Sequence, residues 1–369
     1  MSRRVYLHVG APKTGTSYLQ DRLRSNRKLL AEHGVHYPLG PLGIYAEQFR
    51  PALDLIDVEW RGERGQAEGA WDALVRRVNR LDGTVVVSHE ILAAATADQV
   101  RRAMDDLADS EVHVVYSARD LARQIPAEWQ EGLKHNRRQS YRRFLRKVMS
   151  SEGRANSWFW QVQGLPDVLG RWGTGLSPDR VHLVTVPPSG TPREVLWQRF
   201  CTVLGIDPAW APEEGGRENP SMGAAETALV RRLNRRLVGR NVTPEDHRVL
   251  VKDLLAQQHL AKRPTSAKVT LPSHVFSFAE EVAERWVEWV AGSGIDVVGD
   301  LEDLRPIPPG EDHGWVDPDH PPTRELLDVA LEALAVMTEE AARRPRPEDH
   351  LGERVKKAAR RLRGHESGS

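Results

Sequence analysis

The chain has 369 residues, a length that predicts two domains or one large domain with additions. Its 52 lysines and arginines balance 52 aspartates and glutamates, so it lacks the basic excess of a dedicated nucleic-acid-binding protein. A hydrophobic content of 40% excludes a disordered chain. The single cysteine, Cys201, forms no internal disulfide, and no apolar run is long enough for a secretory signal or a membrane span. We therefore expect a cytoplasmic protein with no transmembrane segment.

Short apolar strands alternate with helical stretches as far as Gly205. Strands are predicted at residues 5–9, 84–88, 111–116 and 180–186. Helices are predicted at residues 17–32, 119–149, 158–172 and 192–204. This alternation indicates an α/β fold, a doubly wound parallel sheet with helices on both faces.

After Gly205 the predicted strands stop and only helical patterns follow, at residues 224–238, 244–260 and 276–290. Residues 280–319 are acidic and proline-rich, and the sequence from Arg343 onward is basic. The chain is therefore predicted to divide into three parts. These are an α/β core at residues 1–222, a helical region packed on it at 223–310, and an extension with a basic tail at 311–369.

Residues 10–17, with the sequence GAPKTGTS, connect the first strand to the first helix. A turn of small residues that enters a helix aims backbone N–H groups and the positive helix end at one point, which favours an anion. Gly15 permits close approach, Thr16 and Ser17 add hydroxyl groups, and Lys13 adds a positive charge. The Walker A pattern requires lysine where this chain has Thr16, which argues against a nucleotide triphosphatase.

The sequence Pro12-Lys13-Thr14-Gly15-Thr16-Ser17 after a first strand resembles the 5′-phosphosulfate loop of sulfotransferases that use 3′-phosphoadenosine 5′-phosphosulfate (PAPS). The resemblance implies that this loop wraps the 5′-phosphate and that Lys13 lies near the oxygen between phosphate and sulfuryl group. It places Tyr18 where cytosolic members often carry a tryptophan near the adenine. Stacking on the adenine and packing at the start of the helix are equal alternatives for Tyr18.

A second signature of the family binds the 3′-phosphate with an arginine at a strand end and a serine eight residues later. Arg119 matches the arginine, whereas Ala127 stands in place of the serine. Arg119 then acts with backbone donors alone, or Arg123, Gln124 or a later loop compensates; a surface ion pair is the other explanation of Arg119. By the same resemblance Arg217, in a polar loop before a helix, is a candidate for a second contact with the 3′-phosphate.

His89 and Glu90 follow the second strand, where sulfotransferases place the base that activates the acceptor. Members acting on phenols and steroids resemble one another in using a histidine there, and those acting on polysaccharides use a glutamate. Because neighbouring side chains diverge at a strand end, we expect only one to face the cleft, and we favour Glu90. The alternatives are a helix-start carboxylate at Glu90 and a partly buried neutral histidine at His89.

The strand, helix and Leu204-Gly205 ending on the C-terminal side also resemble bacterial sulfotransferases, over about residues 4–235. The resemblance implies a P-loop-like sulfotransferase fold and an enzyme that moves a sulfuryl group from PAPS to a hydroxyl or amine of a small-molecule or carbohydrate acceptor. The other product is 3′-phosphoadenosine 5′-phosphate (PAP).

Two other functions are alternatives: a P-loop kinase or nucleotide triphosphatase, and a catalytically silent member that binds PAP. No metal site is expected, because the histidines lack ligand partners at suitable spacing. Trp158, Phe159, Trp160 and Trp172 are candidates either for stacking on the acceptor or for core packing. The sequence predicts neither the acceptor nor the oligomeric state.

Overall fold

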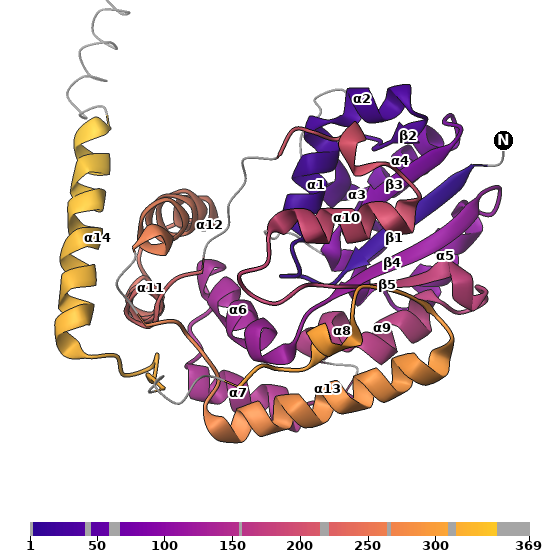
Figure 1. Ribbon diagram of the computed structural model, residues 1–369. Helices are drawn as coiled ribbons and strands as arrows, with labels where there is room; N and C mark the ends of the chain where they lie inside the picture. The colour runs from indigo at the N-terminus through magenta and orange to yellow at the C-terminus, as the bar shows by residue number, and fades with distance from the viewer. Residues whose placement is uncertain are drawn as a thin grey trace, which may run out of the picture.

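The computed structural model describes residues 3–40, 46–58, 67–154, 157–214, 221–263, 267–308 and 315–344. Within these ranges six strands form one parallel sheet in the order β2-β3-β1-β4-β5-β6, with helices on both faces (Figure 1). The strands are β1 (Arg4–Gly10), β2 (Val35–His36), β3 (Thr84–Ser88), β4 (Glu111–Ala118), β5 (Val181–Thr185) and β6 (Asp296–Val298). The predicted α/β fold is confirmed, and so are the added C-terminal helices.

Both faces of the sheet are buried, because its strands carry apolar side chains on either side. On β1, Val5, Leu7 and Val9 belong to one hydrophobic core and Tyr6 to the other. The core around Tyr6 is covered by α1 (Thr16–Ser25), α2 (Arg27–Glu32) and α10 (Arg193–Leu204). The opposite core is covered by α3 (Ala46–Leu55), α4 (Ala70–Val78), α5 (Ala97–Asp106), α8 (Trp158–Gln163), α9 (Leu165–Trp172) and α13 (Ser273–Ser293).

The helix predicted at residues 17–32 is two helices, α1 and α2, which meet at Asn26. The Asn26 amide donates to the carbonyl oxygens of Arg22 and Glu213, each at 2.8 Å, and accepts from the backbone N–H of Glu213 at 3.0 Å. These bonds stabilise the turn between α1 and α2 and attach it to the segment that follows α10. The region predicted as helical at 119–149 is likewise divided, into α6 (Leu121–Lys134) and α7 (Tyr141–Ser150).

The C-terminal part of the chain contributes a strand as well as helices. β6 pairs with β5 in parallel, with His182 opposite Asp296, so the expectation that strands stop after Gly205 is wrong. Three residues are too few to give a period-two pattern that sequence inspection recognises. The division of the chain at residues 222 and 310 stays a prediction, and the basic tail from residue 345 lies outside the described residues.

Helices of the C-terminal part form a group on the side of α6 that faces away from the sheet (Figure 1). They are α11 (Ala224–Arg236), α12 (Pro244–Asp246), a π-helix (His247–His259) and α14 (Thr323–Arg343). The Gln130 amide of α6 donates to the Met222 carbonyl oxygen at 2.6 Å. The Asn234 amide of α11 donates to the carbonyl oxygens of Leu133 at 2.8 Å and Arg137 at 3.0 Å, at the end of α6. α6 therefore lies between the sheet and this helical region.

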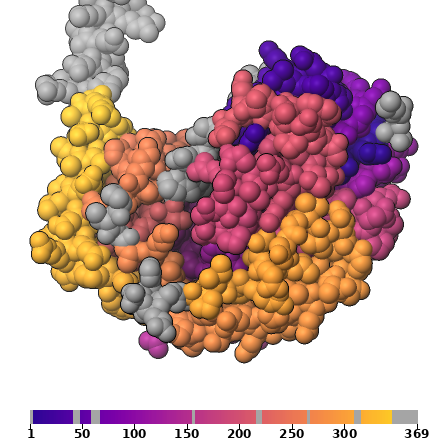
Figure 2. Space-filling view, viewed as in Figure 1, coloured from indigo at the N-terminus to yellow at the C-terminus, as the bar shows by residue number. Residues whose placement is uncertain are grey.

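In the space-filling view the surface is notched between α14, in yellow, and the body that contains the sheet (Figure 2). Among the helices that the structure describes, none combines the length and the apolar character needed to cross a membrane.

Candidate active site

A cleft of about 660 Å³ lies at the carboxyl ends of β1, β3 and β4. The chain leaves β1 toward β3 on one side and returns to β4 on the other, so this is the switch point of the sheet, where α/β proteins bind ligands. The predicted residues that line the cleft are Pro12, Lys13, Gly15, Thr16, Ser17, Tyr18, Glu90 and Arg119. The structure therefore brings together loops that are about a hundred residues apart in the sequence.

The loop between β1 and α1 is fixed by hydrogen bonds within it and from neighbouring helices. The Thr14 hydroxyl donates to the Ala11 carbonyl oxygen at 2.6 Å, so Thr14, predicted as a cofactor contact, has its side chain buried inside the loop. The Pro12 carbonyl oxygen accepts from the amides of Gln124 and, at 3.1 Å, Gln163. These bonds fix the loop while Lys13 and the start of α1 face the cleft.

Gly15 is the residue on which the loop's close packing depends. Its φ of 86° lies in the left-handed region, and a Cβ there would come within 2.5 Å of Leu196 Cδ2 on α10. The backbone at the start of α1 therefore packs directly against α10, and Gly15, Thr16 and Ser17 at this helix end line the cleft.

His8 joins the three strands beneath the cleft. Its Nδ1 lies 2.8 Å from Ser88 Oγ on β3, and its Nε2 lies 3.1 Å from Ser117 Oγ on β4. Burial lowers the pKa of His8 to about 4, although nearby Glu90 and the backbone at Gly10 oppose this. His8 is therefore a neutral, fully buried crosslink at physiological pH.

Glu90 and His89 have different surroundings after β3. Glu90 lines the cleft, and its Oε2 accepts from the Gln20 amide at 3.1 Å. His89 is 3% exposed, and its Nδ1 accepts from the Ile91 N–H at 3.3 Å, which leaves the proton on Nε2. Only Glu90 of this pair lines the cleft.

Electrostatics make Glu90 an ionised group. Burial raises its pKa, but His89, a backbone N–H, Gln20 and Lys13 together bring the pKa below the ordinary value. Burial lowers the pKa of His89, which outweighs the opposite effect of Glu90. At neutral pH the pair is therefore a carboxylate beside a neutral imidazole.

Arg119 lies at the end of β4 and faces the cleft. Its Nε donates to Gln124 Oε1 at 2.9 Å and its Nη2 to the Arg123 carbonyl oxygen at 3.0 Å. Burial lowers the pKa of Arg119 to about 10, so it stays charged at neutral pH. Ala127 also lines the cleft, and Arg217 lies outside the described residues.

One face of α6 supplies site residues that the sequence analysis missed. Glu128, Glu131 and His135 line the cleft together with Lys134. Gln124, Glu128, Glu131 and His135 are spaced at i, i+4, i+7 and i+11. This spacing places the four residues on one helical face, which begins five residues after Arg119. That spacing is the signal in the sequence that could have identified them.

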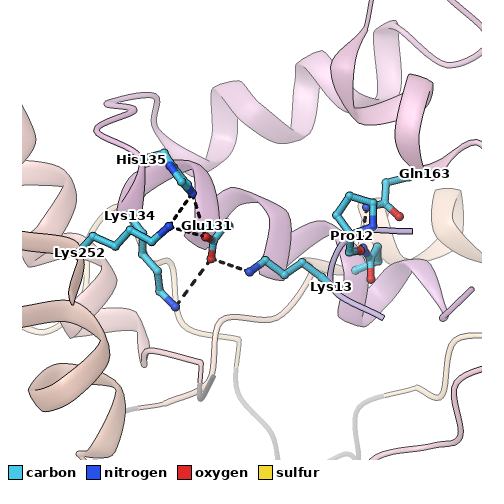
Figure 3. Close-up of polar contacts among 8 residues, drawn as sticks. Pro12, Lys13, Glu131, Lys134, His135, Gln163 and Lys252 are labelled. Carbon is cyan, nitrogen blue, oxygen red and sulfur yellow. Dashed lines mark hydrogen bonds and ion pairs between the residues drawn. The ribbon is translucent and has the colours of Figure 1, made fainter. Parts of the chain in front are cut away.

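Glu131 is surrounded by basic groups (Figure 3). Its Oε2 lies 2.6 Å from Lys13 Nζ and 3.9 Å from Lys134 Nζ, and its Oε1 lies 3.1 Å from His135 Nε2 and 3.5 Å from Lys252 Nζ. Burial raises the pKa of Glu131, but Lys13, His135, Lys134 and Lys252 hold it well below the ordinary value. Burial lowers the pKa of Lys134 to about 8 against the pull of Glu131.

The aromatic residues divide between the cleft and the core. Trp158 lines the cleft beside Glu128, whose pKa is raised by burial. Phe159, Trp160 and Trp172 are buried in the core beneath the sheet. Tyr18 lines the cleft, and its hydroxyl oxygen accepts from Arg22 at 2.7 Å. Within the described ranges no group of three or more His, Cys, Asp or Glu side chains is arranged to hold a metal ion.

A scan against protein-family models found no match to this chain, and neither did a search of curated proteins. Among solved structures, the chain is similar to a sulfotransferase from Alicyclobacillus acidocaldarius, with 17% sequence identity and a TM-score of 0.38. The match covers 67% of this chain and 97% of that chain. A likeness of this degree leaves the function to be inferred from the residues of the cleft.

Proposed function

We propose that this chain is a sulfotransferase that moves the sulfuryl group of PAPS to a hydroxyl or amine of a small-molecule or carbohydrate acceptor. The observation that carries the proposal is the convergence of the Lys13 loop, Glu90 and Arg119 on one cleft. An anion-binding loop, a strand-end guanidinium and an ionised carboxylate are the groups that such a transfer needs.

The cleft fits the donor in size and charge. A volume of about 660 Å³ suits a nucleotide-sized ligand. Backbone N–H groups of the loop, with Thr16, Ser17 and Lys13, would hold the 5′-phosphosulfate. Arg119 would hold the 3′-phosphate, and Arg193, which also lines the cleft, is a candidate to compensate for the hydroxyl that Ala127 lacks.

The transfer needs one proton acceptor and one stabilised leaving group. The acceptor oxygen or nitrogen attacks sulfur and forms a new bond, while the bond from sulfur to the bridging oxygen breaks and PAP leaves with its electron pair. Glu90 would accept the proton of the attacking group. Lys13 would neutralise the charge that develops on the bridging oxygen.

The proposal is tested by calorimetry with PAP, followed by mass spectrometry of candidate acceptors incubated with PAPS. We expect PAP to bind, and Lys13→Met to weaken PAP binding by about 10- to 100-fold, because a charged hydrogen bond is lost. Lys28→Met, which removes an exposed lysine of α2, is the matched control and should leave binding unchanged.

Two results would point elsewhere. Mg²⁺-dependent turnover of ATP without PAP binding contradicts the proposal and favours a kinase or nucleotide triphosphatase. PAP binding without gain of a sulfuryl group on any acceptor favours a silent PAP-binding protein.

A further inference from the structure

The carboxylate of Glu131 links the phosphate loop to the helical region. Its Oε2 faces Lys13 of the loop, whereas its Oε1 faces His135 and Lys252 (Figure 3). Lys252 belongs to the π-helix and also lies 2.9 Å from His135 Nε2. It does not line the cleft, so it reaches the site through Glu131.

Lys13 already has an anionic partner before any ligand enters. The side chains of Lys13 and Glu131 are only 20% and 19% exposed, so water screens their attraction less than at the surface. A donor phosphate at the loop would pair with the same Lys13 ammonium group. It would also place a second negative charge next to Glu131. The cost of that repulsion depends on how well other cations neutralise Glu131.

We propose that Glu131 is a resident counter-ion that competes with the donor for Lys13, and that Lys252 favours donor binding by helping to neutralise Glu131 when Lys13 contacts the donor. This inference rests on the proposed function. It makes Glu131 and Lys252 positioning residues with opposite effects on donor affinity. It also means that the π-helix, through Lys252, influences donor binding.

The inference predicts that two substitutions change PAP affinity in opposite directions, which one binding assay can measure. In calorimetry with PAP on the full chain, Glu131→Gln is expected to bind about tenfold more tightly than the wild type, because a competing charge is gone. Lys252→Met is expected to bind about threefold to tenfold more weakly. In the Glu131→Gln background, Lys252→Met should change affinity by less than about twofold, because the lysine acts through the carboxylate.

Matched controls remove the same charges elsewhere. Glu288→Gln on α13 and Lys262→Met, which follows the π-helix, alter exposed residues and should leave PAP affinity unchanged. Weaker or unchanged PAP binding by Glu131→Gln overturns the inference. So does an equal effect of Lys252→Met in both backgrounds.

A second measurement needs no nucleotide. Competitive acetylation of lysines, read by mass spectrometry, should modify Lys13 faster in Glu131→Gln than in the wild type, because the Lys13 nitrogen is no longer held in the 2.6 Å ion pair with the Glu131 carboxylate. If the wild type fails to bind PAP, the proposed function fails while this assay still reports on the pair. If PAP binds and Lys13 is acetylated equally in both proteins, the inference alone fails.

Discussion

Two adjacent residues after β3, His89 and Glu90, show how a strand end assigns different roles to neighbours. The His89 ring turns inward, where its centroid lies 5.0 Å from that of Phe49 and its Nδ1 receives a backbone N–H. The carboxylate of Glu90 turns to the cleft, where the Gln20 amide orients it. Exposure and ionisation therefore both favour Glu90 as the proposed base.

Replacing Glu90 by glutamine should lower turnover by about 10²- to 10⁴-fold, the usual contribution of a positioned base, while PAP affinity changes little. Steady-state kinetics with a sulfated product and calorimetry with PAP measure the two effects. His89→Ala serves as the comparison, with its thermal unfolding checked because the side chain is buried. Turnover that survives in Glu90→Gln and disappears in a folded His89→Ala would show that the histidine is the base.

At the scale of elements, the corner after β6 depends on a glycine. Gly299 has a φ of 121°, and a Cβ there would lie 2.0 Å from Thr185 Oγ1 and 2.9 Å from Arg199 Nη1. The Thr185 hydroxyl donates to Asp303 at 2.8 Å and accepts from the Asp300 N–H at 3.0 Å. This network connects β5, α10 and the turn that follows β6.

Gly299→Ala should therefore destabilise the fold by about 2–4 kcal/mol, because it combines an unfavourable backbone conformation with a broken buried network. Gly294→Ala is the matched control. Gly294 has a φ of 71°, but its added Cβ would meet nothing closer than Pro178 Cβ at 3.8 Å, so about 1–2 kcal/mol is expected. Urea unfolding measures both values, and equal losses would contradict the role of the network.

The elements that sequence predicted correctly are those with long local signals. β1, β3, β4 and β5 are predominantly apolar runs of five to eight residues, and the loop at residues 10–17 has turn residues at each end. β2 and β6, with two and three residues, are too short for a periodic pattern. Glu131 was missed because Lys13 and Lys252 lie more than a hundred residues away in sequence, although its spacing on α6 was visible.

The stability of the whole molecule should depend on pH through His8. Its pKa in the folded protein is about 4, against an ordinary value of 6.5, because burial disfavours the charged form. As the pH falls below 6.5, His8 binds a proton in the unfolded chain but stays neutral in the folded protein. The free energy of unfolding therefore declines between pH 6.5 and about 4. The full difference corresponds to about 3 kcal/mol.

Urea unfolding at pH 7, 6 and 5 tests this expectation, with His8→Gln as the comparison because glutamine keeps a polar group and does not titrate. The free energy of unfolding should fall less steeply in His8→Gln than in the wild type over this range. Parallel declines in the two proteins would assign the pH dependence to other groups, such as the buried His89 and His247, whose pKa values burial also lowers.

The position of β6 has a consequence for the order in which the chain folds during synthesis. Its residues emerge from the ribosome more than a hundred residues after β5, so β5 remains the unpaired edge of the sheet through the synthesis of α11, the π-helix and α13. An exposed edge strand can pair with strands of other chains. During this time His182 of β5 also lacks the Asp296 carboxylate, which lies 2.7 Å from it in the complete fold. The nascent chain therefore carries an unpaired sheet edge at β5 until β6 has been synthesised, after most of the cleft has been translated.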